Sequence, residues 1–215
     1  MAVSYVMYQY RPDGCDGNRD RDLEALVAST VWSSKREYLN DPFEFAALLG
    51  QDRFPDLVAR ASDVGITCFS RAKTNPLLWS HYANAHKGFA IGWDMSHAFF
   101  GRVNGMAASI ILDVLYEDVP PDPSSFCDEG SYLKAALTTK PTVWSYEQEV
   151  RLIAERGGRR HVIPKEAIKQ VLFGMAMTEQ RMVEIRSHVR AAGICPEFAR
   201  MERRAGSYGV VPVQL

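Results

Sequence analysis

The stretch Trp144-Ser-Tyr-Glu-Gln-Glu-Val-Arg151 indicates how this chain folds, because charged and apolar residues alternate along its second half. A strand over Glu147–Ile153 would turn successive side chains to opposite faces. Glu147, Glu149 and Arg151 then share one face, and apolar residues occupy the other. We therefore expect a strand that carries a polar site on one side and packs against a core on the other.

The two carboxylates of this face predict its chemistry. Carboxylates that share a face raise each other's cost of ionisation, and a neighbouring arginine offsets that cost. Such a face can hold a carboxylate suited to hydrogen bonding or to work as a base. An alternative stays open, in which the face is an exposed strand edge where Glu and Arg pair in water for little energy.

Turn, cap and breaker residues divide the rest of the chain into short elements. Strands are expected at Val3–Tyr10, Thr30–Ser34, Gly65–Ser70, Gly88–Asp94, Ile110–Tyr116, Gln148–Glu155, His161–Ile163 and Tyr208–Val213, and the segment Ala167–Gly174 precedes the last helix. Helices are expected at Asp20–Ser29, before Leu49, from Asn75, at Tyr132–Leu137 and at Thr178–Ala192. The order has no regular βαβ repeat, which favours an α+β fold with mixed or antiparallel sheets around a central cleft and flanking helices.

Length and composition indicate one domain over residues 1–215, with 47% hydrophobic and 24% charged residues. The net charge of −1 supplies no general attraction for nucleic acid or an anionic membrane. Four widely spaced cysteines without a CxxC pair indicate free thiols. The N-terminus has no signal-peptide pattern and the chain has no long apolar run, so we expect a cytoplasmic protein with no membrane partner.

Several short motifs, in their order along the chain, resemble the bacterial family catalogued as domain of unknown function 2971. They are Tyr8-Gln-Tyr-Arg11, Asn40-Asp-Pro-Phe-Glu44, Cys68-Phe-Ser70, Leu78-Trp-Ser-His-Tyr82, His86-Lys-Gly88, Lys140 and Trp144-Ser-Tyr-Glu-Gln-Glu-Val-Arg151. The family name carries no function, so this resemblance assigns no catalytic residue.

A second set of residues resembles the ADP-ribosyltransferases. These enzymes use an Arg or His on an early strand, a Ser or Tyr at the end of a middle strand, and a Glu, often within Glu-x-Glu, on a later strand. Arg11, Ser70 and Glu147-x-Glu149 occur here in that order, although the middle motif is Cys68-Phe-Ser70 and not Ser-Thr-Ser.

The resemblance implies a catalytic set of Glu149, Glu147 and Ser70. Glu149 would hydrogen-bond the nicotinamide ribose of NAD as the glycosidic bond breaks, and Ser70 would orient it. Glu147 would position or deprotonate the acceptor, and Arg11 would grip a ribose or phosphate. A guanidinium suits the last role because its planar donors stay charged.

Further residues are expected to line the NAD site. They are Tyr10, Trp79, His81, Tyr82 and Arg151. Aromatic rings can stack on nicotinamide or adenine, and burial of the same rings in the core is the alternative. His81 and His86 are five positions apart and do not share a helical face, so no metal site is expected.

One compact basic cluster, Arg156, Arg159 and Arg160, surrounds Gly157-Gly158, where a tight hairpin is expected. A run of this kind is typical of a solvated hairpin tip. It could instead guide a nucleic-acid acceptor.

Together these patterns predict an NAD-dependent ADP-ribosyltransferase-like enzyme of a bacterial toxin or phage-defence type, which modifies a nucleic acid or protein and could have an antitoxin or regulator. Two other classes stay open. One is a non-enzymatic sensor that binds a nucleotide or partner, and the other is a metal-dependent nuclease that uses Glu147 and Glu149. Glu149→Gln is expected to lower NAD turnover with little loss of fold.

Overall fold

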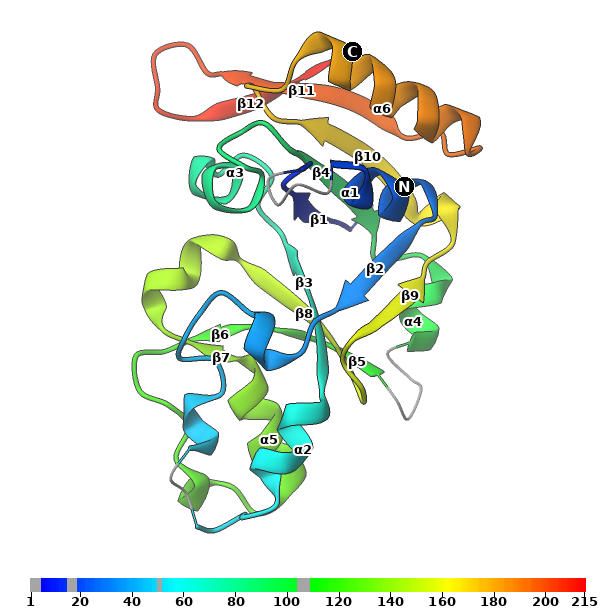
Figure 1. Cartoon of the computed structure of the whole chain (residues 1–215). Helices are drawn as coiled ribbons and strands as arrows, with labels where there is room; N and C mark the ends of the chain where they lie inside the picture. Colours follow the sequence, from blue (N-terminus) through cyan, green and yellow to red (C-terminus); the bar gives the residue numbers. More distant parts are fainter. Residues whose placement is uncertain (1–4, 15–18, 50–51, 104–108) are drawn as a thin grey trace. The chain divides into compact units, whose positions relative to one another are not determined.

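Short strands and helices alternate irregularly along the chain in the computed structural model, which describes residues 5–14, 19–49, 52–103 and 109–215 (Figure 1). The chain forms two compact units. Unit 1 comprises Met1–Val31, Phe69–Arg102 and Val162–Leu215, and unit 2 comprises Trp32–Cys68 and Val103–His161. Neither unit is a contiguous half of the sequence. The predicted α+β class with mixed strand pairing is confirmed.

A mixed sheet forms the centre of unit 1, in the strand order β12-β11-β10-β4-β1. Its strands are β1 (Val6–Arg11), β4 (Phe89–Asp94), β10 (Ile168–Phe173), β11 (Glu197–Arg203) and β12 (Val210–Gln214). Neighbouring strands are antiparallel except β10 and β11, which run parallel. Parallel neighbours need a crossover, and helix α6 (Glu179–Ala191) provides it.

The helices of unit 1 are placed by caps and by apolar contacts. They are α1 (Arg19–Val27), α3 (Pro76–Tyr82), α4 (Ala98–Val103), which reaches the boundary of the unit, α6, and the 3-10 helix η5 (Lys165–Ala167). Asn75 caps α3 by accepting from Leu77 N, and Thr178 caps α6 by accepting from Arg181 N. One core cluster of the unit consists of Tyr8, Trp79, Ala83, Ala90, Leu172, Ala199, Met201 and Val210.

In unit 2, strand β8 (Glu149–Ala154) lies between β3 (Gly65–Ser70) and β5 (Ser109–Asp113). Strands β5 and β8 are antiparallel, and β3 continues into unit 1, where Ser70 pairs with Tyr8. Two smaller pairs accompany them. Strands β6 (Leu115–Tyr116) and β7 (Thr139–Lys140) are parallel, and β2 (Thr30–Ser33) pairs with β9 (Arg159–Val162).

Helices α2 and α5 cover the apolar core of unit 2. The helical segments are α2 (Leu57–Asp63), α5 (Glu129–Thr138) and the 3-10 helices η1 (Arg36–Tyr38), η2 (Ala46–Leu48), η3 (Pro123–Ser125) and η4 (Thr142–Glu147). The core cluster contains Phe45, Leu48, Phe54, Leu57, Ala61, Val64, Ile66, Tyr132, Ala136, Leu137 and Ile153. In the described ranges, every helix is too short or too polar to cross a membrane.

The predicted strand around Glu149 needs two corrections. Glu147 ends η4 and does not lie on the strand, because Gln148 takes a left-handed conformation with φ of 46° and interrupts the extended backbone. The strand is also not an exposed edge, since β3 and β5 flank it and its six residues are buried. Alternation by itself does not show whether a strand lies at an edge or in the middle of a sheet.

Two further predictions differ from the structure. The turn at Gly157-Gly158 does not close a hairpin, because β9 pairs with β2 and not with β8. Strand β11 was not predicted, since Glu197, Glu202 and Arg203 give it a polar character. The expected start of the first strand at Val3 lies outside the described residues, as does Cys15.

Candidate functional site

Five charged side chains meet inside unit 2, around the start of β8. Glu44, Lys140, Glu147, Glu149 and Arg151 are each at most 5% exposed, and we call them the ionic cluster. They come from the turn before η2, from β7, from the end of η4 and from β8. Three carboxylates face two cations, which gives the cluster a formal charge of −1.

Arg151 holds two of the carboxylates at once. Its Nη1 and Nη2 donate to the two oxygens of Glu44 at 2.9 and 2.6 Å. Its Nε and Nη2 donate to the oxygens of Glu149 at 2.8 and 3.1 Å, and Nη1 also donates to the Leu137 carbonyl at 2.7 Å. Such forked pairs fix both distance and angle. The side chain of Arg151 is fully buried and engaged in these bonds, so it positions the carboxylates; its predicted contact with NAD stays a prediction.

Lys140 occupies the centre of the carboxylates. Its Nζ lies 2.6 Å from Glu147, 3.3 Å from Glu149 and 3.7 Å from Glu44, and 4.8 Å from the centre of the Trp144 ring. Burial alone would lower the pKa of Lys140, but Glu149 and Glu147 outweigh burial and raise that pKa above its ordinary value. The ammonium is therefore charged and pairs with all three carboxylates of the cluster.

The local sequence explains why Glu147 and Glu149 both reach this point. Asp118 accepts hydrogen bonds from the Thr142 N–H at 2.9 Å and the Thr142 hydroxyl at 2.6 Å, which fixes the start of η4. The left-handed Gln148 then turns the chain from η4 into β8. The Tyr116 hydroxyl accepts from the Glu149 N–H at 2.8 Å and so holds the first residue of the strand.

The environment of Glu149 keeps its carboxylate ionised. Burial would raise the pKa of Glu149, but Arg151 and Lys140 lower it, with a hydrogen bond from the Cys68 thiol, to about 2. Burial and the charge of Glu149 raise the pKa of Cys68, so the thiol remains protonated. Glu149 is thus a fixed negative charge and is poorly suited to accept a proton at neutral pH.

A pocket of about 240 Å³ adjoins the ionic cluster at Lys140. It is lined by Phe43, Ala46, Ala47, Glu117, Asp118, Pro120, Pro121, Ala136, Thr139, Lys140 and Pro141. Pockets that enclose drug-sized ligands have volumes of about 300–1,000 Å³. This one therefore suits a single ring or a short side chain, and not a whole dinucleotide.

The other predicted catalytic and cofactor residues lie in unit 1. The Tyr10 hydroxyl donates to the Ala72 carbonyl at 2.6 Å, and the Ser70 hydroxyl oxygen accepts from the Ala72 N–H at 3.0 Å, so both side chains meet at one turn. Arg11 donates to Gln9 Oε1 at 3.0 Å. Whether these residues share a cleft with Glu149 stays a prediction.

The predicted aromatic residues of α3 differ in exposure. Trp79 is fully buried, its Nε1 donates to the Lys73 carbonyl at 2.8 Å, and its ring packs edge-on against Tyr10 at 5.1 Å. Trp79 is therefore part of the core, which was the alternative to stacking on a ligand. His81 is exposed, and its ring lies 6.3 Å from that of the half-buried Tyr82.

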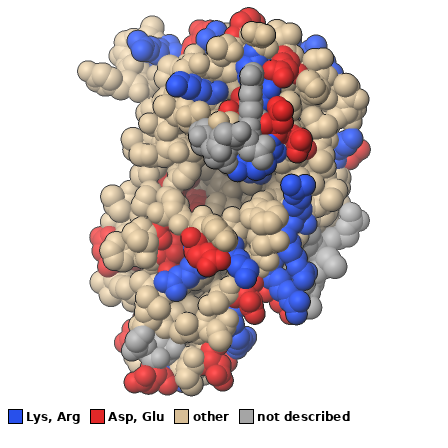
Figure 2. Space-filling model, viewed as in Figure 1, with Lys and Arg blue, Asp and Glu red and all other residues tan. Residues whose placement is uncertain are grey.

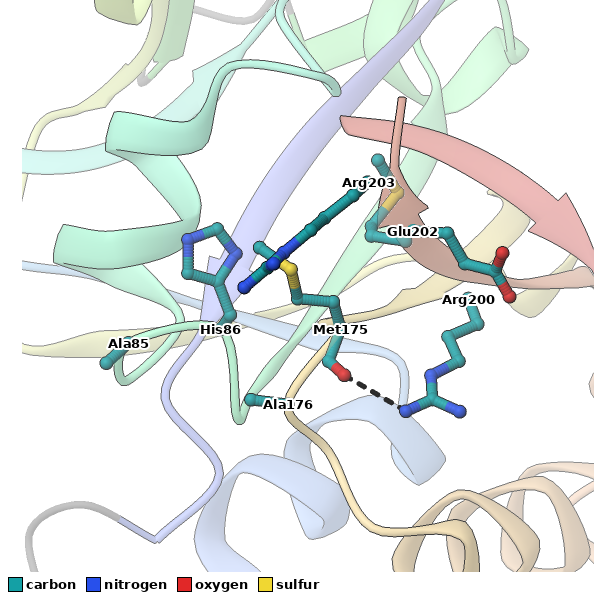
Figure 3. A pocket seen from close by; sticks show the side chains of 8 residues that line it. Ala85, His86, Met175, Ala176, Arg200, Glu202 and Arg203 are labelled. Atoms are coloured by element: carbon teal, nitrogen blue, oxygen red, sulfur yellow. Dashed lines mark hydrogen bonds between the residues drawn. The ribbon is translucent and has the colours of Figure 1, made fainter. Parts of the chain in front are cut away.

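Unit 1 also contains an open groove of about 710 Å³ beside His86 (Figure 3). Its lining includes Met175, Arg200 and Arg203; Arg200 donates to the Met175 carbonyl at 3.0 Å, and Arg203 extends toward His86 in the view. The groove's loop is strained, since Asn84, Ala85 and His86 all have positive φ. Sequence reasoning missed the arginines of this groove, which lie on the unpredicted strand β11.

Sequence reasoning also missed the roles of Glu44, Cys68 and Lys140. All three lie within the motifs that resemble the unknown-function family. Those motifs were the sequence feature that could have identified them. Their convergence is a long-range effect, since Glu44 and Arg151 are 107 positions apart. In the described part of the chain, no group of three or more His, Cys, Asp and Glu side chains is arranged to hold a metal ion.

Comparison with known proteins gives one match. Residues 78–152 match the family described as protein of unknown function (DUF2971), a segment that includes four members of the ionic cluster. The match supports the resemblance to that family. No curated protein and no solved structure matches the chain significantly.

Proposed function

We propose that this protein is an NAD-dependent ADP-ribosyltransferase-like enzyme in which Glu149 faces the nicotinamide ribose of NAD. The observation that most supports this proposal is the state of the Glu149 carboxylate. Arg151 and Lys140 hold it in place and keep its pKa at about 2, so it is negatively charged throughout the physiological range.

A fixed carboxylate fits the chemistry of NAD cleavage. As the bond between nicotinamide and ribose breaks, positive charge develops on the ribose ring. A carboxylate already aimed at that position stabilises the charge without reorganising, and a site shielded from water strengthens the effect. Glu147, whose carboxylate bonds to Lys140 at 2.6 Å, would position the acceptor. Arg151 and Lys140 are then positioning residues.

Nicotinamide release from NAD tests the proposal. Glu149→Gln should reduce release by a factor on the order of 10²–10³, because the amide lacks the stabilising charge. The matched control is Glu44→Gln, which removes the same charge from the same cluster on the other side of Arg151. We expect the control to lose less than about tenfold per folded molecule.

Two outcomes would contradict the proposal. Full turnover by Glu149→Gln would show that another group stabilises the transition state. Glu149→Gln and Glu44→Gln could also lose nicotinamide release equally, each in proportion to its loss of folded protein. That result would show that the carboxylates act only by stabilising the fold.

A second candidate function is a non-enzymatic module that binds a nucleotide or partner. The observation that favours it is that each of the five charges is buried and paired within the cluster, as in a structural network. A ligand that binds the native state raises the melting temperature. A shift with NAD but no nicotinamide release, in wild-type protein, would favour this module over the enzyme.

A further inference from the structure

A basic surface lies in unit 2, around the turn that precedes β9 and the first residues of that strand. It consists of Arg156, Arg159 and Arg160 together with Lys35, and we call it the basic ribbon. Figure 2 shows a stripe of basic side chains in blue to the right of the centre, in the region where Figure 1 places β9. The three arginines are exposed, and among the described residues none of them forms an ion pair.

The backbone beneath the basic ribbon is firmly held. Gly157 N–H donates to the Asp63 carbonyl at 2.7 Å, and Gly158 N–H donates to the Ser33 carbonyl at 2.8 Å. A Cβ at Gly157 would lie 2.7 Å from Lys35 Cγ, so the Lys35 side chain lies directly against this turn. The cations are therefore presented by a backbone that is fixed before binding, so only their side chains become ordered when a ligand binds.

The surroundings of the ribbon keep its charge positive. The acidic residues next to its four cations include Glu155, which precedes the turn, and Asp63, whose backbone carbonyl accepts from Gly157. None of these cations is needed to neutralise the ionic cluster. A local excess of this kind attracts phosphates although the whole chain has a net charge of −1.

An exposed aromatic ring lies on the strand beside the basic ribbon. Trp32 on β2 is 45% exposed, whereas its strand neighbours Val31 and Ser33 are buried. An indole that stays at the surface beside cations can stack on an unpaired base while the cations contact the backbone phosphates. The bases of a duplex are not available for such stacking.

We propose that the basic ribbon and Trp32 bind single-stranded nucleic acid. If the protein is an ADP-ribosyltransferase as proposed above, this surface makes nucleic acid, and not protein, the acceptor. This assignment of the acceptor rests on the proposed function. The binding itself requires no NAD. It depends on phosphate contacts from the arginines and on stacking of a base against Trp32.

Fluorescence anisotropy with a fluorescein-labelled oligothymidine of about 20 nucleotides tests this proposal in the absence of NAD. Arg159→Ala with Arg160→Ala should weaken binding about tenfold and flatten the slope of log K against log salt by about 1.4, since each phosphate contact contributes about 0.7. The matched control is Arg190→Ala with Arg204→Ala, two exposed arginines of unit 1, which should change binding by less than about twofold.

Stacking is tested separately from charge. Trp32→Ala should weaken oligothymidine binding about 5–100-fold with an unchanged salt slope, and Tyr208→Ala, at another exposed aromatic residue, should have no effect. Circular dichroism of each variant confirms the fold. The proposal would be overturned by any of three results. These are no binding by the wild-type protein, equal losses of affinity in the two arginine double variants, and duplex binding as tight as single-strand binding. Because NAD is absent, these outcomes are distinct from a failure to release nicotinamide.

Discussion

At the scale of single residues, the charge that a substitution removes from the ionic cluster decides its effect on stability. Arg151→Met leaves three carboxylates around one ammonium, and an uncompensated buried charge costs about 3–5 kcal/mol. Glu149→Gln leaves two carboxylates and two cations, and its amide can still accept from Arg151, so we expect a loss of about 1–3 kcal/mol. Urea unfolding followed by tryptophan fluorescence measures both free energies.

Arg151→Lys separates charge from geometry in the same cluster. Arg151→Lys keeps the positive charge but loses the forked hydrogen bonds that span Glu44 and Glu149. Its loss in the free energy of unfolding should therefore lie between those of Arg151→Met and Glu149→Gln. Equal losses for Arg151→Met and Glu149→Gln would mean that net charge does not control this site. From the sequence, Glu149→Gln was expected to leave the fold nearly unchanged. The buried contacts of Glu149 instead predict a measurable loss in the free energy of unfolding.

At the scale of elements, the junction between η4 and β8 depends on the backbone of Gln148. Its side chain is exposed and its φ is 46°, so a substitution there acts mainly through the conformation of the chain. Gln148→Val should destabilise the protein by about 1–2 kcal/mol, because β-branched residues rarely adopt the left-handed region. Thermal unfolding measures the difference.

Gln148→Asn serves as the control at the same position. Asparagine tolerates the left-handed region, so we expect a change within about 0.5 kcal/mol. If valine proved as stable as asparagine, the left-handed turn that brings Glu147 and Glu149 to one point would not be a constraint on the fold.

At the scale of the whole molecule, the low pKa of Glu149 links stability to pH. A pKa lowered from 4.5 to about 2 means that the unfolded chain binds the proton more readily than the folded one. The stabilisation is present above pH about 4.5 and is lost as the pH falls through about 2; it amounts to roughly 3 kcal/mol in full. When the pH falls from 5 to 3, the free energy of unfolding should therefore drop by about 2 kcal/mol less in Glu149→Gln than in the wild-type protein.

Urea unfolding of the two proteins at both pH values checks this linkage. The other carboxylates titrate in both proteins, so the difference between them isolates Glu149. Parallel pH profiles would show that Arg151 and Lys140 do not hold the carboxylate as the structure indicates.

The sequence by itself determined most of the elements and the importance of the segment from Lys140 to Arg151. Gly65–Ser70 matches β3 from end to end, and the helix expected from Thr178 is capped by the side chain of that residue. These features are local, because caps, turns and alternation act over a few residues. Spacing placed Glu149 and Arg151 on one strand face, which the structure confirms, but the strand placement of Glu147 was wrong.

Only the tertiary structure decided what surrounds those residues. Contacts between distant segments decide three features of the site. Glu44 lies across Arg151, Lys140 lies between the carboxylates, and β8 is a central strand. Periodicity carries no information on such partners. The strand face allowed a carboxylate for hydrogen bonding or for work as a base. The same contacts make Glu149 unsuited to work as a base, since two cations and burial set its pKa and neither is visible in the alternation of the strand.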